Sequence, residues 1–153
     1  NKQLNFDTDF ELLFPDDYIN SNSERLNLYS ELNKITKQDE LELFNKNLID
    51  RFGELPLQVI DLLKSIELKW LGIRLGFDKI ILKRNTLICY FIGNNDNNEN
   101  FLKLIKFANL NHKLSNISEK QTKEGNRMVI KFFNIHSINS AQKLLEKIIK
   151  TQY

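Results

Sequence analysis

The apolar residues of this chain change their spacing once, at Gly76, and that change limits the folds open to it. Before Gly76 they recur every three or four residues, the period of helices that bury one face. After Gly76 the apolar runs are short enough for strands and are separated by two helical stretches. The sequence therefore predicts an α+β protein, with a helical half followed by a half that contains a sheet.

The first half, residues 1–76, is expected to hold an N-terminal strand and three helices. Between Phe6 and Leu12, apolar residues alternate with acidic ones, the period of a half-exposed strand. Ser21 and Glu24 have the spacing of a capping box that begins the first helix. The remaining boundaries are expected at Thr36, which can cap the second helix, at Gly53, which ends it, and at Pro56 and Gly76, which bound the third.

The second half, residues 77–153, is expected to repeat a strand–strand–helix unit. Strands are predicted at 77–83, 86–92, 112–120 and 126–133, and helices around 101–108 and 141–149, the last capped by Ser137 or Asn139. The polar residues 93–98 are expected to form a mobile loop. A four-stranded antiparallel sheet with both helices on one face, ββαββα, would bury the apolar residues of both. The two halves together are expected to make one domain.

The two halves carry opposite charges, although the formal net charge is only +2. Residues 1–76 contain nine Lys and Arg against fourteen Asp and Glu, and residues 77–153 contain thirteen against six. This split predicts that different faces meet different neighbours. The acidic half is a poor surface for nucleic acid, because it would repel phosphate.

The sequence contains no motif for catalysis or for a cofactor. Its five glycines are scattered singly, so it has no phosphate-binding loop. Cys89 lies in an apolar run, which favours a small buried side chain over a catalytic thiolate, and a lone cysteine fits a reducing cytoplasm. His112 and His136 are far in sequence from the acidic clusters, so a zinc site is not expected. We expect a non-catalytic chain that holds no metal or cofactor.

Acidic side chains give two further candidates. Asp7, Asp9 and Glu11 would share one face of a strand, where they could bind a hard metal, but the solvated face of an edge strand explains them more simply. Asp50 lies in the last turn of its helix, where the helix dipole disfavours an anion, and Lys46 is placed only for a weak pairing. Asp50 is therefore expected to have a partner outside its own helix, in the same domain or in another.

The basic half raises an alternative, a nucleic-acid-binding module. Five lysines fall on its two predicted helices at helical spacing: Lys103, Lys106, Lys143, Lys147 and Lys150. The solvated face of an amphipathic helix would also explain them. Its strand aromatics lie in apolar runs and do not match the RNA-binding signature of ribonucleoprotein folds.

Three segments of the first half resemble one known family. They read Phe14-Pro15-Asp16-Asp17-Tyr18-Ile19, Glu24-Arg25-Leu26-x-Leu28-Tyr29 and Leu48-Ile49-Asp50-Arg51-Phe52-Gly53-x-Leu55-Pro56. In order and spacing, residues 9–76 are similar to the C-terminal domain of bacterial transcription-repair coupling factors, often called Mfd. The chain does not begin with Met, and we expect it to be a piece of a longer protein.

The resemblance implies a regulatory role in transcription-coupled nucleotide excision repair. In this family, other domains form an ATP-driven translocase that displaces stalled RNA polymerase from DNA and recruits UvrA. The C-terminal domain packs on the UvrB-like N-terminal module of the same factor and covers the surface that UvrA uses, which is autoinhibition. By this resemblance, Asp50 and Arg51 are expected to belong to the docking region, and Asn47 stands where the family often has Glu. The protein is expected to be cytoplasmic, which fits its lone cysteine, and no apolar run is long enough for a membrane span.

Overall fold

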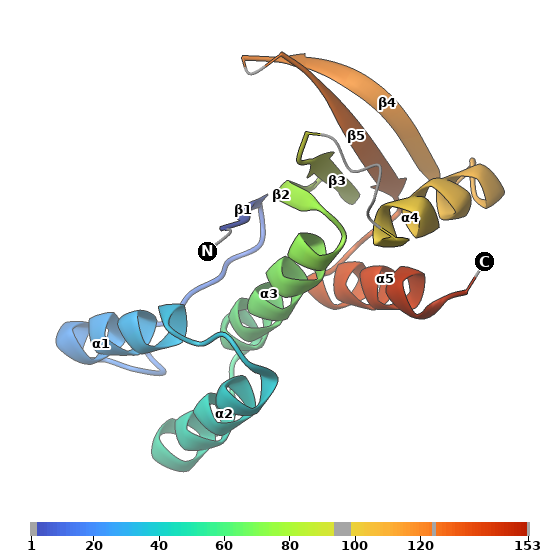
Figure 1. The fold of residues 1–153 in the computed structure, drawn as a ribbon. Helices are drawn as coiled ribbons and strands as arrows, with labels where there is room; N and C mark the ends of the chain where they lie inside the picture. The colour runs from blue at the N-terminus through green and yellow to red at the C-terminus, as the bar shows by residue number, and fades with distance from the viewer. Residues whose placement is uncertain (1–2, 94–98, 124, 153) are drawn as a thin grey trace. The chain divides into compact units, whose positions relative to one another are not determined.

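The fold is α+β, as the sequence predicts, and the residues that the structure describes form five helices and one five-stranded sheet (Figure 1). The computed structural model describes residues 3–93, 99–123 and 125–152, so most of the predicted loop at 93–98 lies outside the described residues. The elements are β1 (Asn5–Thr8), α1 (Asn22–Asn33), α2 (Gln38–Phe52), α3 (Leu57–Arg74), β2 (Phe77–Lys83), β3 (Thr86–Phe91), α4 (Glu99–Leu110), β4 (Ser115–Thr122), β5 (Gly125–Phe133) and α5 (Ile138–Lys150).

Contacts within the chain group it into two compact units. The sheet unit comprises residues 1–9 and 68–153, and the helical unit comprises residues 10–67. Helix α3 contributes its first part to the helical unit and its last turns to the sheet unit. The change from helix to strand falls at Gly76 as predicted, but β1 belongs with the sheet that follows it.

The sheet has the strand order β1-β2-β3-β5-β4, which corrects the predicted four-stranded sheet. Strands β2 to β5 form the expected antiparallel set, and β1 adds a fifth strand that runs parallel to β2. Asn5 lies opposite Lys79, and Thr8 lies opposite Leu82, whose carbonyl accepts the Thr8 hydroxyl at 2.7 Å. The prediction missed this pairing because alternation identifies a strand but not its partner.

The N-terminal strand is also shorter than the alternating pattern predicts: it ends at Thr8, whereas the pattern continues to Leu12. The two aspartates near its end contact the turn between β2 and β3. Asp7 forms an ion pair with Lys83 at 2.9 Å, and the Asp9 carboxylate accepts the backbone N–H of Arg84 at 3.3 Å. Only Asp7 of the three acidic residues lies in β1, so the predicted strand face shared by Asp7, Asp9 and Glu11 does not form; Asp7 and Asp9 instead contact the end of β2 and the turn that follows it.

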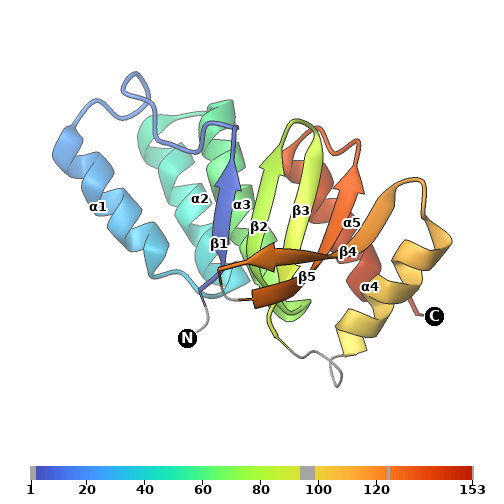
Figure 2. The same ribbon diagram turned by 90° about the horizontal axis from the view of Figure 1, so that it is seen from above.

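Helices α4 and α5 lie on one face of the sheet, as predicted (Figure 1). Phe107 of α4 packs against Phe132 with ring centroids 5.9 Å apart, and Phe101 packs against Phe91 at 4.8 Å. Neither helix covers the opposite face, and the β4–β5 hairpin curves over that face in front of β2 and β3 (Figure 2).

The helical unit buries apolar side chains from α1, α2 and the first part of α3. Ser21 caps α1 as predicted, with its hydroxyl accepting the N–H of Glu24 at 3.3 Å. The cap of α2 is Lys37 instead of Thr36. The Glu40 carboxylate reaches back and accepts the backbone N–H of both residues at 3.1 Å, so the side chain of Thr36 is not needed as a cap.

Candidate functional site

The first two sequence motifs of the helical unit bind each other. The Arg25 guanidinium donates to the carbonyl of Ile19 and lies 3.5 Å from the carboxylate of Asp16. The Tyr29 hydroxyl accepts the backbone N–H of Phe14 at 2.8 Å, and their rings pack with centroids 4.7 Å apart. These residues therefore fix the turn that precedes α1, which gives them a structural role.

The third motif is joined to the first at the end of α2. The Tyr18 hydroxyl donates to the carbonyl of Gly53 at 2.8 Å, and the Tyr18 ring lies 5.8 Å from the ring of Phe52. Gly53 has a φ of 90°, a left-handed conformation that favours glycine and ends the helix. The predicted docking residues therefore lie on a helix whose end is held in place.

The three predicted docking residues, Asn47, Asp50 and Arg51, lie together on α2. All three are exposed and line one shallow pocket of about 150 Å³ between α1 and α2. Glu31 of α1 lines the same pocket from the other side. Apolar side chains of Leu28, Phe44 and Leu48 line the rest of the pocket, so polar and apolar groups are mixed on this surface.

Arg51 has a partner inside the helical unit. Its guanidinium forms an ion pair with Glu24 in the first turn of α1. The guanidinium carbon also lies 4.7 Å from the centroid of the Phe52 ring. The internal partner that the sequence left open therefore exists for Arg51, and this side chain joins α2 to α1.

Asp50 differs from its neighbour. It is exposed in the last turn of α2, where the carbonyl end of the helix disfavours a negative charge. Among the residues that the structure describes, none forms an ion pair or a side-chain hydrogen bond with Asp50, and this includes Lys46. An anion in this position is available to a cationic or hydrogen-bonding group outside the chain.

Leu43 belongs to the same face of α2 and was missed by the sequence analysis. It lies four residues before Asn47 and seven before Asp50, a spacing that puts all three on one side of a helix. Its side chain is 58% exposed, which is high for a large apolar residue. The 4–3 spacing is visible in the sequence, but Leu43 lies outside the apolar stripe of α2 that faces the core, so that stripe does not reveal it. We call Leu43, Asn47 and Asp50 the α2 face.

The other candidate residues show no catalytic arrangement. Cys89 is fully buried in β3, and burial raises the pKa of its thiol well above the ordinary value, which disfavours the reactive thiolate. His112 and His136 are exposed. In the described part of the chain, no group of three His, Cys, Asp or Glu side chains is placed to hold a metal ion. No described helix is long and apolar enough to cross a membrane.

Comparison with known proteins identifies the family. The family model of the TRCF domain matches residues 8–104, which is more than half of the chain. The chain belongs to the TRCF domain family. This match includes the three motifs and confirms the resemblance to the C-terminal domain of transcription-repair coupling factors.

Similar proteins carry the same family name over a small part of their length. The transcription-repair-coupling factor of Rickettsia conorii is 29% identical over 94 residues, which cover 61% of this chain and 8% of that protein. Its counterpart in Rickettsia typhi is 24% identical over 149 residues, 95% of this chain and 12% of that protein. The chain thus spans about a tenth of the length of these relatives.

A solved structure shares the fold. It is described as the crystal structure of the C-terminal domain of transcription-repair coupling factor, and it superimposes with a TM-score of 0.68. The alignment covers 98% of this chain and 95% of that chain at 20% sequence identity. The similarity extends beyond residue 104, where the family model stops, so it includes the part of the sheet unit in which the sequence showed no motif.

Proposed function

We propose that this chain is a non-catalytic regulatory domain of a cytoplasmic transcription-repair coupling factor. It docks on the UvrB-like N-terminal module of the same factor and masks the surface that UvrA binds. Release of the domain exposes that surface during transcription-coupled nucleotide excision repair. The parent factor acts on RNA polymerase and DNA through its other domains.

The observation that carries this proposal is the exposed, unpaired carboxylate of Asp50 on the α2 face. An anion at the carbonyl end of a helix lowers stability by roughly 0.3–1 kcal/mol. None of the described residues forms an ion pair with Asp50 that would offset this loss. A cation on a docked module would offset the cost. Leu43, about two turns earlier on the same face of α2, adds apolar area that such a module would bury.

The charge of the helical unit supports a protein partner over DNA. Residues 10–67 hold twelve Asp and Glu against six Lys and Arg, and residues 1–9 with 68–153 hold eight against sixteen. The acidic unit would repel phosphate and attract a basic protein surface. Interfaces between domains of one chain are typically modest in area and polar, which suits the α2 face.

The nucleic-acid alternative has weaker support on the helices where the sequence placed it. The ammonium group of Lys103 donates to the carbonyl of Ile149 at 2.5 Å, so it is used at the end of α5. Lys143, Lys147 and Lys150 are exposed on α5, as the solvated side of an amphipathic helix requires. We therefore keep the regulatory role as the proposed function.

The experiment is to measure UvrA binding to the full-length factor with Asp50→Lys. Each loss of about 1.4 kcal/mol in docking raises the open population about tenfold while the closed form dominates, so UvrA should bind more tightly. Glu42→Lys is the matched control. It makes the same charge change on α2 at an exposed position turned by roughly 80° from Asp50, given about 100° per residue. Equal UvrA affinity in wild type and both variants, with intact folds, would remove Asp50 from the proposed interface.

A further inference from the structure

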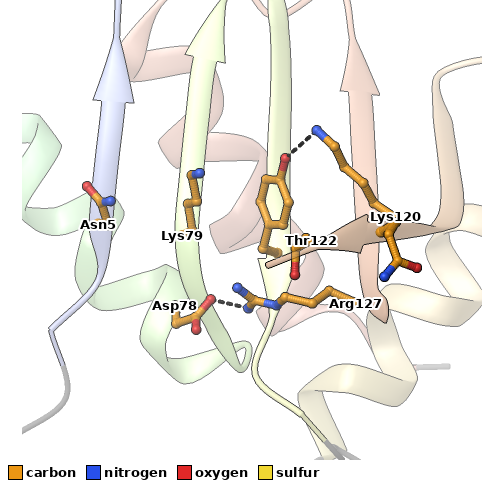
Figure 3. Close-up of a pocket in the computed structure, with 8 residues that line it drawn as sticks. Asn5, Asp78, Lys79, Lys120, Thr122 and Arg127 are labelled. Carbon is orange, nitrogen blue, oxygen red and sulfur yellow. Dashed lines mark hydrogen bonds and ion pairs between the residues drawn. The ribbon is translucent and has the colours of Figure 1, made fainter. Parts of the chain in front are cut away.

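A pocket of about 460 Å³ opens on the face of the sheet that α4 and α5 leave uncovered (Figure 3). Its floor comes from β1, β2 and β3, and its wall comes from residues 120–122 of β4 and Arg127 of β5. All of the lining residues belong to the sheet unit. Pockets of roughly 300–1,000 Å³ are the size that binds small ligands in proteins.

Three cationic side chains in this pocket surround one aromatic ring. The ammonium groups of Lys79 and Lys120 lie 5.1 Å and 5.5 Å from the ring centroid of Tyr90, and the guanidinium carbon of Arg127 lies at 5.5 Å. Because each charged group lies within 5.5 Å of the same ring centroid, any two of them are at most about 11 Å apart. The Tyr90 hydroxyl accepts a hydrogen bond from Lys120 at 2.9 Å, which fixes this lysine over the pocket.

The described residues that line the pocket carry an excess of positive charge. Among them Asp78 is the one carboxylate, and it forms an ion pair with Arg127 (Figure 3). This pairing leaves the charges of Lys79 and Lys120 without a carboxylate among the lining residues. Because both ammonium groups lie within about 5.5 Å of the Tyr90 ring centroid, an anion bound beside the ring would be within reach of the attraction of both lysines.

Arg127 holds the pocket together. It donates to the carbonyl of Phe91 at 2.5 Å as well as to Asp78, and its side chain is only 17% exposed. These bonds tie β5 to β2 and β3, and Lys120 is the residue paired with Arg127 on the neighbouring strand β4. Arg127 is therefore a positioning residue, and the two lysines are the groups that remain to contact a ligand.

We propose that this pocket binds a phosphate group, held chiefly by Lys79 and Lys120. Lysine ammonium groups recognise phosphate as point charges, and Gln121 and Asn5 at the rim can add hydrogen bonds. Tyr90 as a whole residue is only 4% exposed, and three cations lie over its ring, so it offers little free surface on which a nucleobase could stack. The pocket therefore recognises the phosphate itself, whether a small phosphorylated ligand or a nucleic-acid backbone supplies it.

The test is a binding titration of the 153-residue chain with two probes, inorganic pyrophosphate and a short duplex DNA. We expect Lys79→Gln and Lys120→Gln each to weaken binding about tenfold, because each removes a charge-assisted contact. Lys131→Gln is the matched control. It removes one positive charge from β5 four residues after Arg127, on the same face of the strand but outside the pocket.

The two probes distinguish the source of the phosphate. Binding of pyrophosphate that depends on both lysines supports the proposal with a small ligand as the source, and binding of DNA alone with the same dependence supports it with a backbone as the source. The proposal is overturned if wild type binds neither probe at millimolar concentration, or if Lys131→Gln weakens binding as much as the pocket variants do. Thermal melting of each variant separates a lost contact from a lost fold.

Discussion

Arg51 at the end of α2 forms an ion pair with Glu24 in the first turn of α1. The two residues come from different sequence motifs, and the pair joins the ends of two helices. Asp50, the residue before Arg51, has no such partner among the described residues. The two neighbouring residues of the motif therefore differ in role: Arg51 connects α2 to α1 within the unit, and Asp50 is an exposed anion.

Arg51→Gln should lower stability and leave docking nearly unchanged. The ion pair is partly exposed, with 54% of the Arg51 side chain accessible, so we expect a loss of about 0.2–1 kcal/mol in the free energy of unfolding. Urea denaturation measures this change, and Lys46→Gln on the same helix is the control because it breaks no ion pair found in the described residues. A variant that keeps its stability but no longer docks would assign Arg51 to the interface instead.

Asp50→Asn should slightly stabilise the isolated domain. It removes an anion from the carbonyl end of α2, and we expect a gain of roughly 0.3–1 kcal/mol at low salt that shrinks as salt is added. The thermal midpoint at two salt concentrations is the measurement. A destabilised variant would mean that Asp50 has an internal role.

Tyr29→Phe should destabilise the helical unit by about 1–3 kcal/mol. The phenol oxygen accepts the backbone N–H of Phe14 at 2.8 Å, and its removal leaves this donor without an acceptor in a partly buried turn. The ring contact with Phe14 is kept in the variant, so the hydrogen bond is the only change. A urea midpoint equal to that of wild type would show that water replaces the hydroxyl at no cost.

Asp61→Asn should stabilise the chain at neutral pH and not at acid pH. Burial raises the pKa of Asp61 above its ordinary value, and Lys64 only partly opposes this shift. The folded chain therefore binds the proton more tightly than the unfolded chain does, so stability falls as pH rises from the unfolded to the folded pKa. Below an unfolded pKa of about 3.9 the wild-type carboxyl is neutral in both states, and the gain should vanish. Thermal midpoints at pH 3 and pH 7 are the measurement, and equal gains at both would contradict this explanation.

The sequence was informative where local patterns decide the structure. The change of period at Gly76, the cap at Ser21 and the turn at Arg84 and Asn85 all appear as predicted. Both residues of that turn have φ near 60°, as a tight antiparallel hairpin requires. Such features depend on a few neighbouring residues, and the sequence displays them directly.

Features that depend on residues far apart in the chain could not be predicted from the sequence. The pairing of β1 with β2 joins residues more than seventy positions apart, and alternation alone cannot choose a partner strand. The pocket around Tyr90 likewise needs the hairpin to curve back over the sheet. In the sequence Tyr90 lies in an apolar run, and the three cations over its ring come from three other strands, so the sequence gives no sign that they contact it.

The affinity of this domain for the UvrB-like N-terminal module of its own factor, measured in trans by calorimetry, tests the regulatory role most directly. We predict a measurable complex with wild type and with Glu42→Lys, and a complex at least tenfold weaker with Asp50→Lys, the loss expected when about 1.4 kcal/mol of docking energy is removed. The same titration with UvrA present should show competition for the module. Absence of any complex between the folded domain and the folded module would contradict the proposed regulation.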